Sequence, residues 1–238
     1  MAKSKINNLI QLQEKLKELS DPKQAKILQR FFKTGKGEYG EGDVFLGVKV
    51  PIQRKIVSGF RDLSQKDIER LLNSNIHEYR MTALLILVSQ YEKANEREKK
   101  IIFDFYLKNS KKINNWDLVD ISASKIVGDH LMKKPRTVLY KFVRSRNLWQ
   151  RRIAIISTFT FIRNNDFDDT LRISKMLLSD KHDLIHKAVG WMLREVGKRD
   201  QKIEEEFLKE HYSEMPRVML RYAIEKFNEK KRKFYLKK

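Results

Sequence analysis

Apolar residues recur along most of the chain at intervals of three and four, which is the period of helices with one buried face. The first such stripe joins Leu9, Leu12, Leu16 and Leu19. Similar patterns cover residues 20–33, 64–72, 77–93, 95–109, 114–127, 135–145, 148–162, 166–178, 182–198, 201–211 and 215–228. The connections are short and polar, so neighbouring helices are expected to run antiparallel.

Helix start signals support two of these assignments. Asp21 is a candidate N-cap with Pro22 at the first helical position. Ser64 is followed three residues later by Asp67, which is the spacing of a capping box. The chain holds only 9 Gly and 4 Pro, too few turn residues for an all-β fold. The pattern therefore predicts an all-α protein, and we assign residues 1–238 to a single domain.

Two segments depart from the helical pattern. Residues 34–43, TGKGEYGEGD, hold four of the nine glycines and no apolar periodicity, which predicts a mobile loop. Residues 229–238 form a basic C-terminal tail. The tail is either a solvated helix end or an arm that contacts phosphates, and the two interpretations have equal weight.

A dozen helices of this length can form a globular bundle or a solenoid of stacked helix pairs. The helix pairs recur at roughly 30–45 residues, the period of HEAT-like repeats. This favours a superhelical stack of antiparallel helix pairs, a HEAT-like repeat solenoid. Its concave face would carry basic residues and be wide enough for a nucleic-acid duplex.

The net charge of the protein indicates the class of molecule that it binds. Lys and Arg total 51 against 31 Asp and Glu, a net charge of +20, which is typical of proteins that bind a polyanion. Nucleic acid is the first candidate for this polyanion, and an anionic membrane surface is the second. No apolar run approaches the roughly 20 residues that cross a bilayer, and the N-terminus MAKSKINNLIQL lacks the apolar core of a signal peptide. The expectation is a cytoplasmic, nucleoid-associated protein with no membrane partner. The absence of cysteine excludes disulfides, thiol catalysis and cysteine-ligated metals.

The stretch NNWDLVD, residues 114–120, places Trp116 and Asp120 four residues apart and hence on one helix face. The small residues 122–124 would leave room beside that face. A carboxylate that faces a basic groove opposes polyanion binding, so its presence requires a reason. Either Asp120 neutralises a nearby Lys or Arg, which composition alone favours, or it has a chemical role.

A second tryptophan lies outside the apolar stripe of its helix. The expected core stripe of residues 182–198 comprises Ile185, Ala188, Val189, Met192 and Val196. Trp191 instead shares a face with three cations, which are Lys187, Arg194 and Lys198. A lone tryptophan usually packs on a neighbouring helix, but cations at helical spacing around it favour a wall that faces a ligand.

Arg152 lies within an apolar face, where a guanidinium is seldom found without a partner. It either forms an internal salt bridge or is held rigidly toward a phosphate. His182 and His186 are four residues apart, but no third ligand is evident and HDLIH is not a zinc-protease signature. We expect no metal site, and no Gly-rich phosphate loop or nucleophile elbow occurs.

Four strings carry a resemblance to a known family. FLGVKVPIQRK, NNWDLVD, NLWQRRIAI and IHKAVGWMLRE, in this order, resemble the AlkD-like DNA alkylation-repair glycosylases from about residue 20 to about residue 228. The resemblance implies a fold of HEAT-like repeats. It also implies hydrolysis of the N-glycosidic bond of cationic alkylated purines, such as 3-methyladenine and 7-methylguanine, in duplex DNA during base excision repair.

The resemblance assigns roles to the residues singled out above. It implies that Asp120 is the catalytic aspartate, with Trp116 and Trp191 as the two tryptophans beside it. Arg152 falls on the arginine that contacts phosphate, and Gly47 and Pro51 match the family's Gly-x-x-x-Pro turn. The DNA-contacting cations are then expected to be Arg152, Lys187, Arg194, Lys198, Arg54 and Lys49.

At two positions the chain departs from the best-known family pattern. Phe31 and Lys49 stand where that pattern has Tyr and Gln. These differences leave the implied catalytic residues intact and bear on lesion range and on DNA affinity. The family is understood to engage the deoxyribose of the lesion rather than a captured base, and no motif for a base-sized pocket is evident in this sequence.

The implied enzyme is a monofunctional alkylpurine DNA glycosylase that acts as a monomer, with no cofactor and no metal. Two alternatives belong to other classes. One is a non-catalytic HEAT-like protein that binds damaged or branched DNA. The other is a helical-repeat protein scaffold whose basic face binds acidic proteins.

Overall fold

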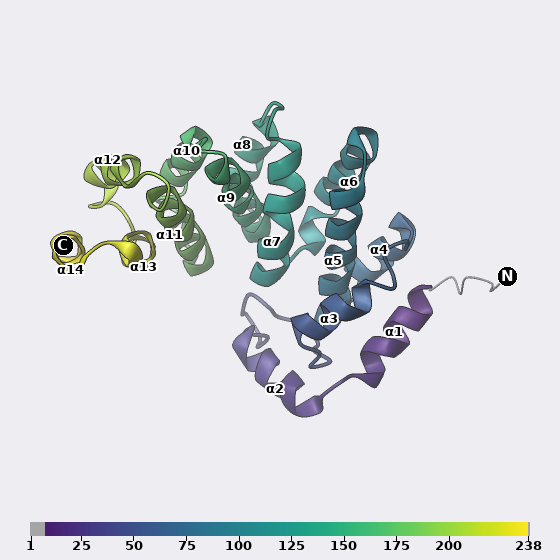
Figure 1. Ribbon diagram of the computed structural model, residues 1–238. Coiled ribbons are helices and arrows are strands. Elements are labelled where there is room, and N and C mark those ends of the chain that lie inside the picture. Colours follow the sequence, from purple (N-terminus) through teal and green to yellow (C-terminus); the bar gives the residue numbers. More distant parts are fainter. Residues whose placement is uncertain (1–7, 238) are drawn as a thin grey trace. The chain divides into compact units, whose positions relative to one another are not determined.

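The computed structural model describes residues 8–237, and the regular structure within them is helical throughout (Figure 1). The predicted all-α class is therefore confirmed. The one β-type pairing among these residues is an isolated bridge between Val44 and Ile76. The chain divides into two compact units between Ser122 and Ala123.

Among the described residues, the first unit runs from residue 8 to Ser122, which lies in the seventh helix. Its helices are α1 (Leu9–Glu18), α2 (Pro22–Phe31), α3 (Val50–Val57), α4 (Gln65–Leu72), α5 (His77–Lys93), α6 (Glu96–Lys108), the 3₁₀ turn η1 (Ser110–Lys112) and α7 (Trp116–Ala123). Helix α5 is the centre of this unit, because α3, α4 and α6 all pack on it (Figure 1). Its residues 77–88 are all buried, which explains why its sequence is apolar around the helix rather than on one stripe.

The second unit has a comparable plan. Its helices are the π-helical turn η2 (Ser124–Gly128), α8 (Thr137–Val143), α9 (Leu148–Arg163), α10 (Asp168–Met176), α11 (Asp183–Gly197), α12 (Gln201–His211), α13 (Arg217–Ala223), the 3₁₀ turn η3 (Ile224–Lys226) and α14 (Glu229–Leu236). Helix α9 is central here, with η2, α8, α10 and α11 packed on it, and α11 packs in turn on α13.

Most predicted helix positions are confirmed. The Asp21 carboxylate accepts hydrogen bonds from the backbone N–H groups of Lys23 and Gln24 at 2.9 and 3.1 Å. The Ser64 hydroxyl accepts one from the N–H of Asp67 at 3.2 Å. Placing Leu19 on the buried stripe was wrong: α1 ends at Glu18, so Leu19 points away from the core and is 44% exposed.

The helical patterns omitted two helices. Helix α3 has Pro51 in its first turn, which is a start signal, but the whole helix is only eight residues long. Helix α14 occupies most of the basic tail. It is capped by Asn228, whose side chain accepts from the N–H of Lys231 at 3.0 Å, and it is anchored by the buried Tyr235. The tail is thus a helix end, and its contact with phosphates stays a prediction. Residues 1–7 and 238 lie outside the described residues, and with them most of the segment used for the export prediction.

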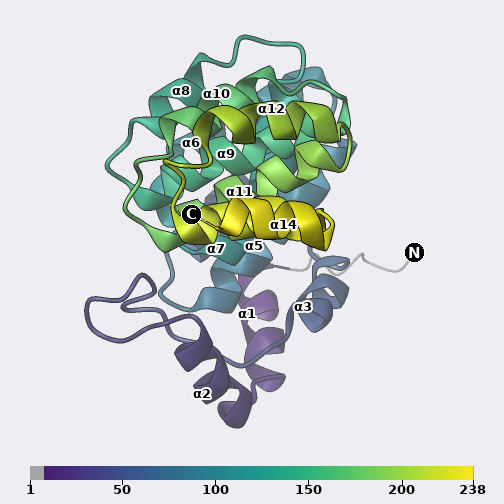
Figure 2. The same ribbon diagram turned by 90° about the vertical axis from the view of Figure 1, so that its left-hand side faces the viewer.

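The glycine-rich segment 34–43 connects α2 to α3 without helical structure (Figure 2). It is folded by local turns, in which the Glu38 and Glu41 carboxylates accept from the N–H groups of Gly35 and Gly37 at 2.9 and 2.8 Å. Gly37 adopts a φ of 78°, which favours glycine. None of the helices in residues 8–237 is long and apolar enough to cross a membrane.

Candidate functional site

Trp116 and Asp120 lie one turn apart on α7, in the first unit. Trp116 is the first residue of the helix, and four residues of α-helix advance about 6 Å along the axis. Both side chains are half-buried. Burial raises the pKa of Tyr106, and the negative charge of Asp120 raises it further.

An aromatic cluster holds Trp116 in place. Its ring stacks on Phe32, with centroids 5.3 Å apart and an interplanar angle of 19°, and meets the edge of Phe31 at 5.9 Å. Phe32 also stacks on Phe45 at 5.1 Å, and Phe45 stacks on His77 at 4.6 Å. The indole at the start of α7 is therefore packed against the end of α2, far away in the sequence, which restricts its rotamer.

A buried polar network lies at the end of this stack. The His77 imidazole bonds to Asp43 through Nδ1 at 3.2 Å and to Asp117 through Nε2 at 2.8 Å. Asp43 also pairs with Arg80 at 2.6 Å and accepts from the side chain of Asn115 at 3.3 Å. The network connects the end of the glycine-rich segment, the start of α5 and the first turn of α7.

The network shifts the titration of its members. Burial on its own lowers the pKa of His77, but the charge of Asp117 and hydrogen bonds to Asp117 and Asp43 raise it to about 9. Burial also disfavours the charged form of Asp43, yet the hydrogen bond to His77 and the charge of Arg80 hold its pKa below the ordinary value. At neutral pH His77 is therefore a positively charged imidazolium that faces the side chains of Asp43 and Asp117.

Glu78, the next residue on α5, fixes the turn that precedes α3. Its buried carboxylate accepts from the backbone N–H groups of Leu46, Gly47 and Val48 at 2.9, 2.8 and 3.3 Å. Gly47 has a φ of 89°, and a Cβ there would lie 2.2 Å from the carbonyl oxygen of Asp21, so no other residue fits. This explains the glycine of the Gly-x-x-x-Pro turn.

Sequence reasoning missed Asp43, His77, Glu78 and Arg80. A signal was present, because the stretch IHEYR puts His77, Glu78 and Arg80 at the start of a helix whose middle is apolar all round. Lys49 and Arg54, which it did select, lie at the N-cap of α3 and on α3 itself. Both are exposed, and neither forms an ion pair with any of residues 8–237.

In the second unit, Trp191 lies on α11 as expected, outside a fully buried apolar stripe. Its indole N–H donates to the Glu195 carboxylate at 3.1 Å, and its ring lies 5.9 Å from that of Phe159. The prediction of the α11 core stripe is confirmed, because all the residues of that stripe, from Ile185 to Val196, are fully buried.

The three cations that share the face of Trp191 are all paired with acids. Lys187 pairs with Asp183 at 2.6 Å, and Lys198 pairs with Glu195 at 2.7 Å. The third cation, Arg194, pairs with Glu225 and lies 3.5 Å from Glu195. Exposed ion pairs of this kind are weak, so a phosphate can compete for Lys187 and Lys198, whereas Arg194 is largely covered.

Arg152 is buried, with 4% of its surface exposed. Its Nη1 donates to the carbonyl oxygen of Leu184 at 2.5 Å, which connects α9 to the first turn of α11. In this conformation the Arg152 guanidinium joins two helices of the second unit. A phosphate contact by Arg152 stays a prediction.

His182 and His186 have local roles. The His182 ring caps α11 by accepting from the N–H of Leu184 at 3.1 Å, and burial lowers its pKa. His186 bonds through Nε2 to the carbonyl oxygen of Asp180 at 2.6 Å. The geometry explains both rings without a ligand. The roles that the resemblance implies for Trp116, Asp120, Arg152 and Trp191 fall on both units, and they stay predictions.

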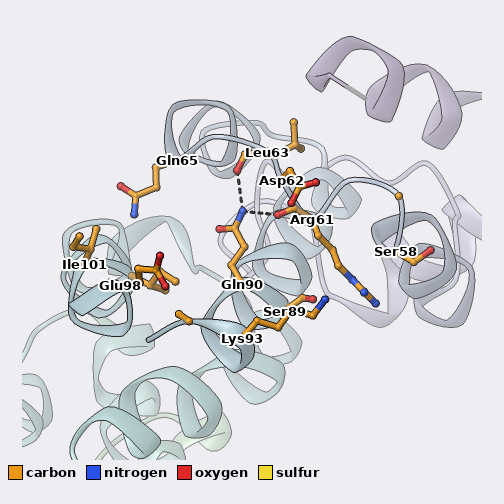
Figure 3. Close-up of a pocket in the computed structure, with 13 residues that line it drawn as sticks. Ser58, Arg61, Asp62, Leu63, Gln65, Ser89, Gln90, Lys93, Glu98 and Ile101 are labelled. Atoms are coloured by element: carbon orange, nitrogen blue, oxygen red, sulfur yellow. Dashed lines mark hydrogen bonds between the residues drawn. The ribbon is translucent and has the colours of Figure 1, made fainter. Parts of the chain in front are cut away.

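Two of the cavities in the first unit lie along α5. The larger, about 680 Å³, surrounds Gln90 near the C-terminal end of α5 (Figure 3). Gln90 crosses it to donate to the carbonyl oxygens of Arg61 and Leu63 at 2.7 and 2.8 Å. Since Gln90 lies 13 residues after His77, this cavity is about 20 Å along the helix from the network. The smaller cavity, about 320 Å³, is lined by Phe31, Phe32, Phe45, His77 and Asp117 among others, and therefore adjoins Trp116.

Comparison with known proteins decides the family. The family model for DNA alkylation repair enzymes matches residues 12–227. The chain belongs to the DNA alkylation repair enzyme family. A solved structure from Enterococcus faecalis, described as a predicted DNA alkylation repair enzyme, is similar with a TM-score of 0.69 and 18% identity over 88% of this chain and 97% of that one. That likeness shows that the two share a helical fold. No curated protein matches the sequence.

Membership of this family indicates which class of molecule the positively charged protein binds. A DNA alkylation repair protein acts on DNA, in agreement with the net charge of +20.

Proposed function

We propose that the protein is a DNA glycosylase that hydrolyses the N-glycosidic bond of cationic N3- and N7-alkylated purines in duplex DNA. The observation that carries the proposal is the pairing of Trp116 and Asp120 on consecutive turns of α7, in a member of the DNA alkylation repair family. Trp116 is held by an aromatic cluster, and Asp120 follows it one turn later on the same face.

The chemistry of the substrate explains why these residue types suffice. An alkylated purine that already carries a positive charge leaves as a neutral base, so no general acid is needed to protonate it. What develops is an oxocarbenium-like deoxyribose that water must attack, as in glycoside hydrolysis. One carboxylate can stabilise this cation and orient or deprotonate the water.

The remaining residues would hold the substrate. The indole faces of Trp116 and Trp191 suit a sugar that becomes positively charged, because an aromatic face attracts a cation. Lys49 and Arg54 on the first unit, and Lys187 and Lys198 on the second, are accessible to phosphates. Arg152 and Arg194 are held by protein partners, so their contribution to DNA binding is less direct.

The proposal is tested by Asp120→Asn, which keeps the shape of the side chain and removes its charge. We expect single-turnover release of 7-methylguanine from labelled duplex to fall by about 100-fold or more. Duplex affinity should be unchanged or slightly higher, because one charge that repels phosphate is gone.

The matched control is Asp104→Asn on α6, in the same unit. Asp104 is exposed and pairs only with Lys100 among residues 8–237, so excision by this variant should equal that of the wild type. Wild-type excision by Asp120→Asn would rule out the mechanism. A wild-type protein that binds duplex tightly and releases no base would favour the non-catalytic DNA-binding alternative.

A further inference from the structure

Helix α14 is attached to the rest of the second unit through one of its faces. Its Tyr235 is 4% exposed and packs on the rings of Tyr212 and Phe227, with centroids 5.4 and 5.9 Å away. The backbone carbonyl oxygen of Leu236 accepts from Arg217 Nη1 at 2.8 Å. These contacts fix the orientation of the helix, which lies along the surface of the second unit (Figure 2).

The opposite face of α14 carries a row of lysines. Lys230, Lys233 and Lys237 follow one another at intervals of three and four residues, so they lie on one side of the helix. All three are exposed, and neither Lys230 nor Lys237 forms an ion pair with any of residues 8–237. Lys233 pairs with Glu229 at 2.6 Å, but both side chains are at least 70% exposed, and such an ion pair is weak.

This row of lysines does not stabilise the helix that carries it. Lys233 and Lys237 are four residues apart, and like charges at that spacing destabilise a helix. The buried Tyr235 on the other face holds α14 in place without them. An anionic partner would relieve the repulsion between the lysines, so their arrangement indicates a surface that binds a polyanion.

Two kinds of polyanion fit such a face, and α14 favours DNA over an anionic membrane. A helix that binds a membrane surface inserts an apolar face into it. Phe234, at 62% exposed, is the large apolar side chain that α14 exposes, and one ring gives little area to insert. The row of lysines spans about 10 Å of helix, a length over which duplex DNA carries about six phosphate charges. Membership of the DNA alkylation repair family supplies the same partner.

We propose that α14 is an additional DNA-binding surface, on which Lys230, Lys233 and Lys237 contact the phosphate backbone of the duplex. Contacts to phosphates carry no sequence information. The helix therefore strengthens binding to any duplex and does not select an alkylated base. The inference rests on the proposed function only in taking DNA as the partner, and it does not depend on the chemistry of base release.

The test measures how the affinity of the full-length protein for an undamaged duplex depends on salt, by fluorescence anisotropy. The triple variant Lys230→Gln, Lys233→Gln and Lys237→Gln removes the three charges and leaves Tyr235 in place. Each phosphate contact contributes about 0.9 to the slope of log affinity against log salt, so the slope should fall by about two to three.

The matched control removes the same number of charges elsewhere in the second unit. It combines Lys141→Gln, Lys175→Gln and Lys209→Gln, which lie on α8, α10 and α12, in the other layer of this unit from α11 and α13 (Figure 1). All three lysines are exposed and form no ion pair with any of residues 8–237. The slope of the control should fall by less than about one. Because the change in net charge is equal, the difference between the two variants reports α14 itself, and thermal unfolding checks that both are folded.

A further variant and a second ligand separate DNA from a membrane. Phe234→Ala removes the exposed ring without changing the charge, and it should keep the wild-type slope. Co-sedimentation with vesicles of phosphatidylcholine and phosphatidylserine tests the membrane. Vesicle binding that is lost in the α14 triple variant, with an unchanged slope on duplex, would assign α14 to a membrane surface and overturn the inference.

The remaining outcomes distinguish this inference from the proposed function. A wild-type slope in the α14 triple variant, or an equal reduction in the control, would overturn the inference and leave the glycosylase proposal untouched. Failure of the wild type to release methylated bases would count against the glycosylase proposal. It would leave the α14 result intact, because the duplex in the binding test carries no alkylated base.

Discussion

His77 shows how a single residue in the first unit connects three segments that are distant in sequence. Its ring is 97% buried, bonds to carboxylates on two other segments, and stacks on Phe45. Asp117, one of these carboxylates, lies next to Trp116 in the first turn of α7. His77 therefore helps to position the first turn of α7.

The raised pKa of His77 predicts a pH-dependent stability. Its pKa is about 9 in the folded protein and about 6.5 in the unfolded chain, so folding takes up a proton between these values. The stabilisation is fully present below about pH 6.5 and is lost as the pH rises through about 9. For His77→Gln we expect a loss in the free energy of unfolding on the order of 2–3 kcal/mol at pH 6, and a much smaller loss near pH 10.

Urea unfolding of the wild type and of His77→Gln at the two pH values measures this difference. Glu204 in the second unit also titrates in this range, because burial raises its pKa to about 8. It is present in both proteins, so its effect cancels in the comparison. An equal loss at pH 6 and at pH 10 would show that the imidazole acts through shape alone.

At the scale of elements, glycine decides how closely two helices of the second unit approach. A Cβ on Gly190 of α11 would lie 2.3 Å from the carbonyl oxygen of Met219 on α13. A backbone carbonyl within a helix cannot move aside for a new Cβ as the end of a flexible side chain can. We therefore expect Gly190→Ala to lower the free energy of unfolding by about 2 kcal/mol or more, because it forces the two helices apart.

Gly37→Ala is the comparison variant for Gly190→Ala. Nothing lies within 4 Å of a Cβ at Gly37, but its φ of 78° costs an L-residue about 1 kcal/mol. Thermal or urea unfolding should therefore rank Gly190→Ala as the more harmful substitution. The reverse order would mean that α11 and α13 separate easily.

For the whole molecule, the net charge of +20 predicts a strong dependence of DNA affinity on salt. A protein that contacts about six phosphates loses roughly 10³-fold in affinity between 50 and 200 mM salt. We expect a loss of this order for unmodified duplex. A nearly flat salt dependence would contradict the assignment of DNA as the partner.

Individual cations should contribute unequally to this dependence. Arg54 is exposed and has no ion pair within residues 8–237, so Arg54→Ala should reduce the slope of log affinity against log salt by about one. Lys187 is already paired with Asp183, so Lys187→Ala should reduce the slope by less. Filter binding or fluorescence anisotropy at four or five salt concentrations compares the variants. Equal reductions would show that the ion pair opens fully on DNA.

Local patterns along the chain were sufficient to predict the helical class, most helix positions, the Asp21 and Ser64 caps and the buried stripe of α11. These features depend on contacts within a few residues, which periodicity and capping chemistry report directly. They were also sufficient to single out Trp116 and Asp120, because helical spacing alone puts both on one face.

Tertiary packing decided the rest. The carboxylates that bond to His77 and the N–H groups that bond to Glu78 lie 30 to 40 residues away along the chain, and no local pattern identifies them. The same holds for Arg152, whose apolar surroundings were evident from the sequence but whose acceptor, the carbonyl oxygen of Leu184, belongs to another helix. The cavity beside Trp116 exists because α2, the turn before α3, and α5 converge there, and a cavity is a property of that convergence rather than of any one segment.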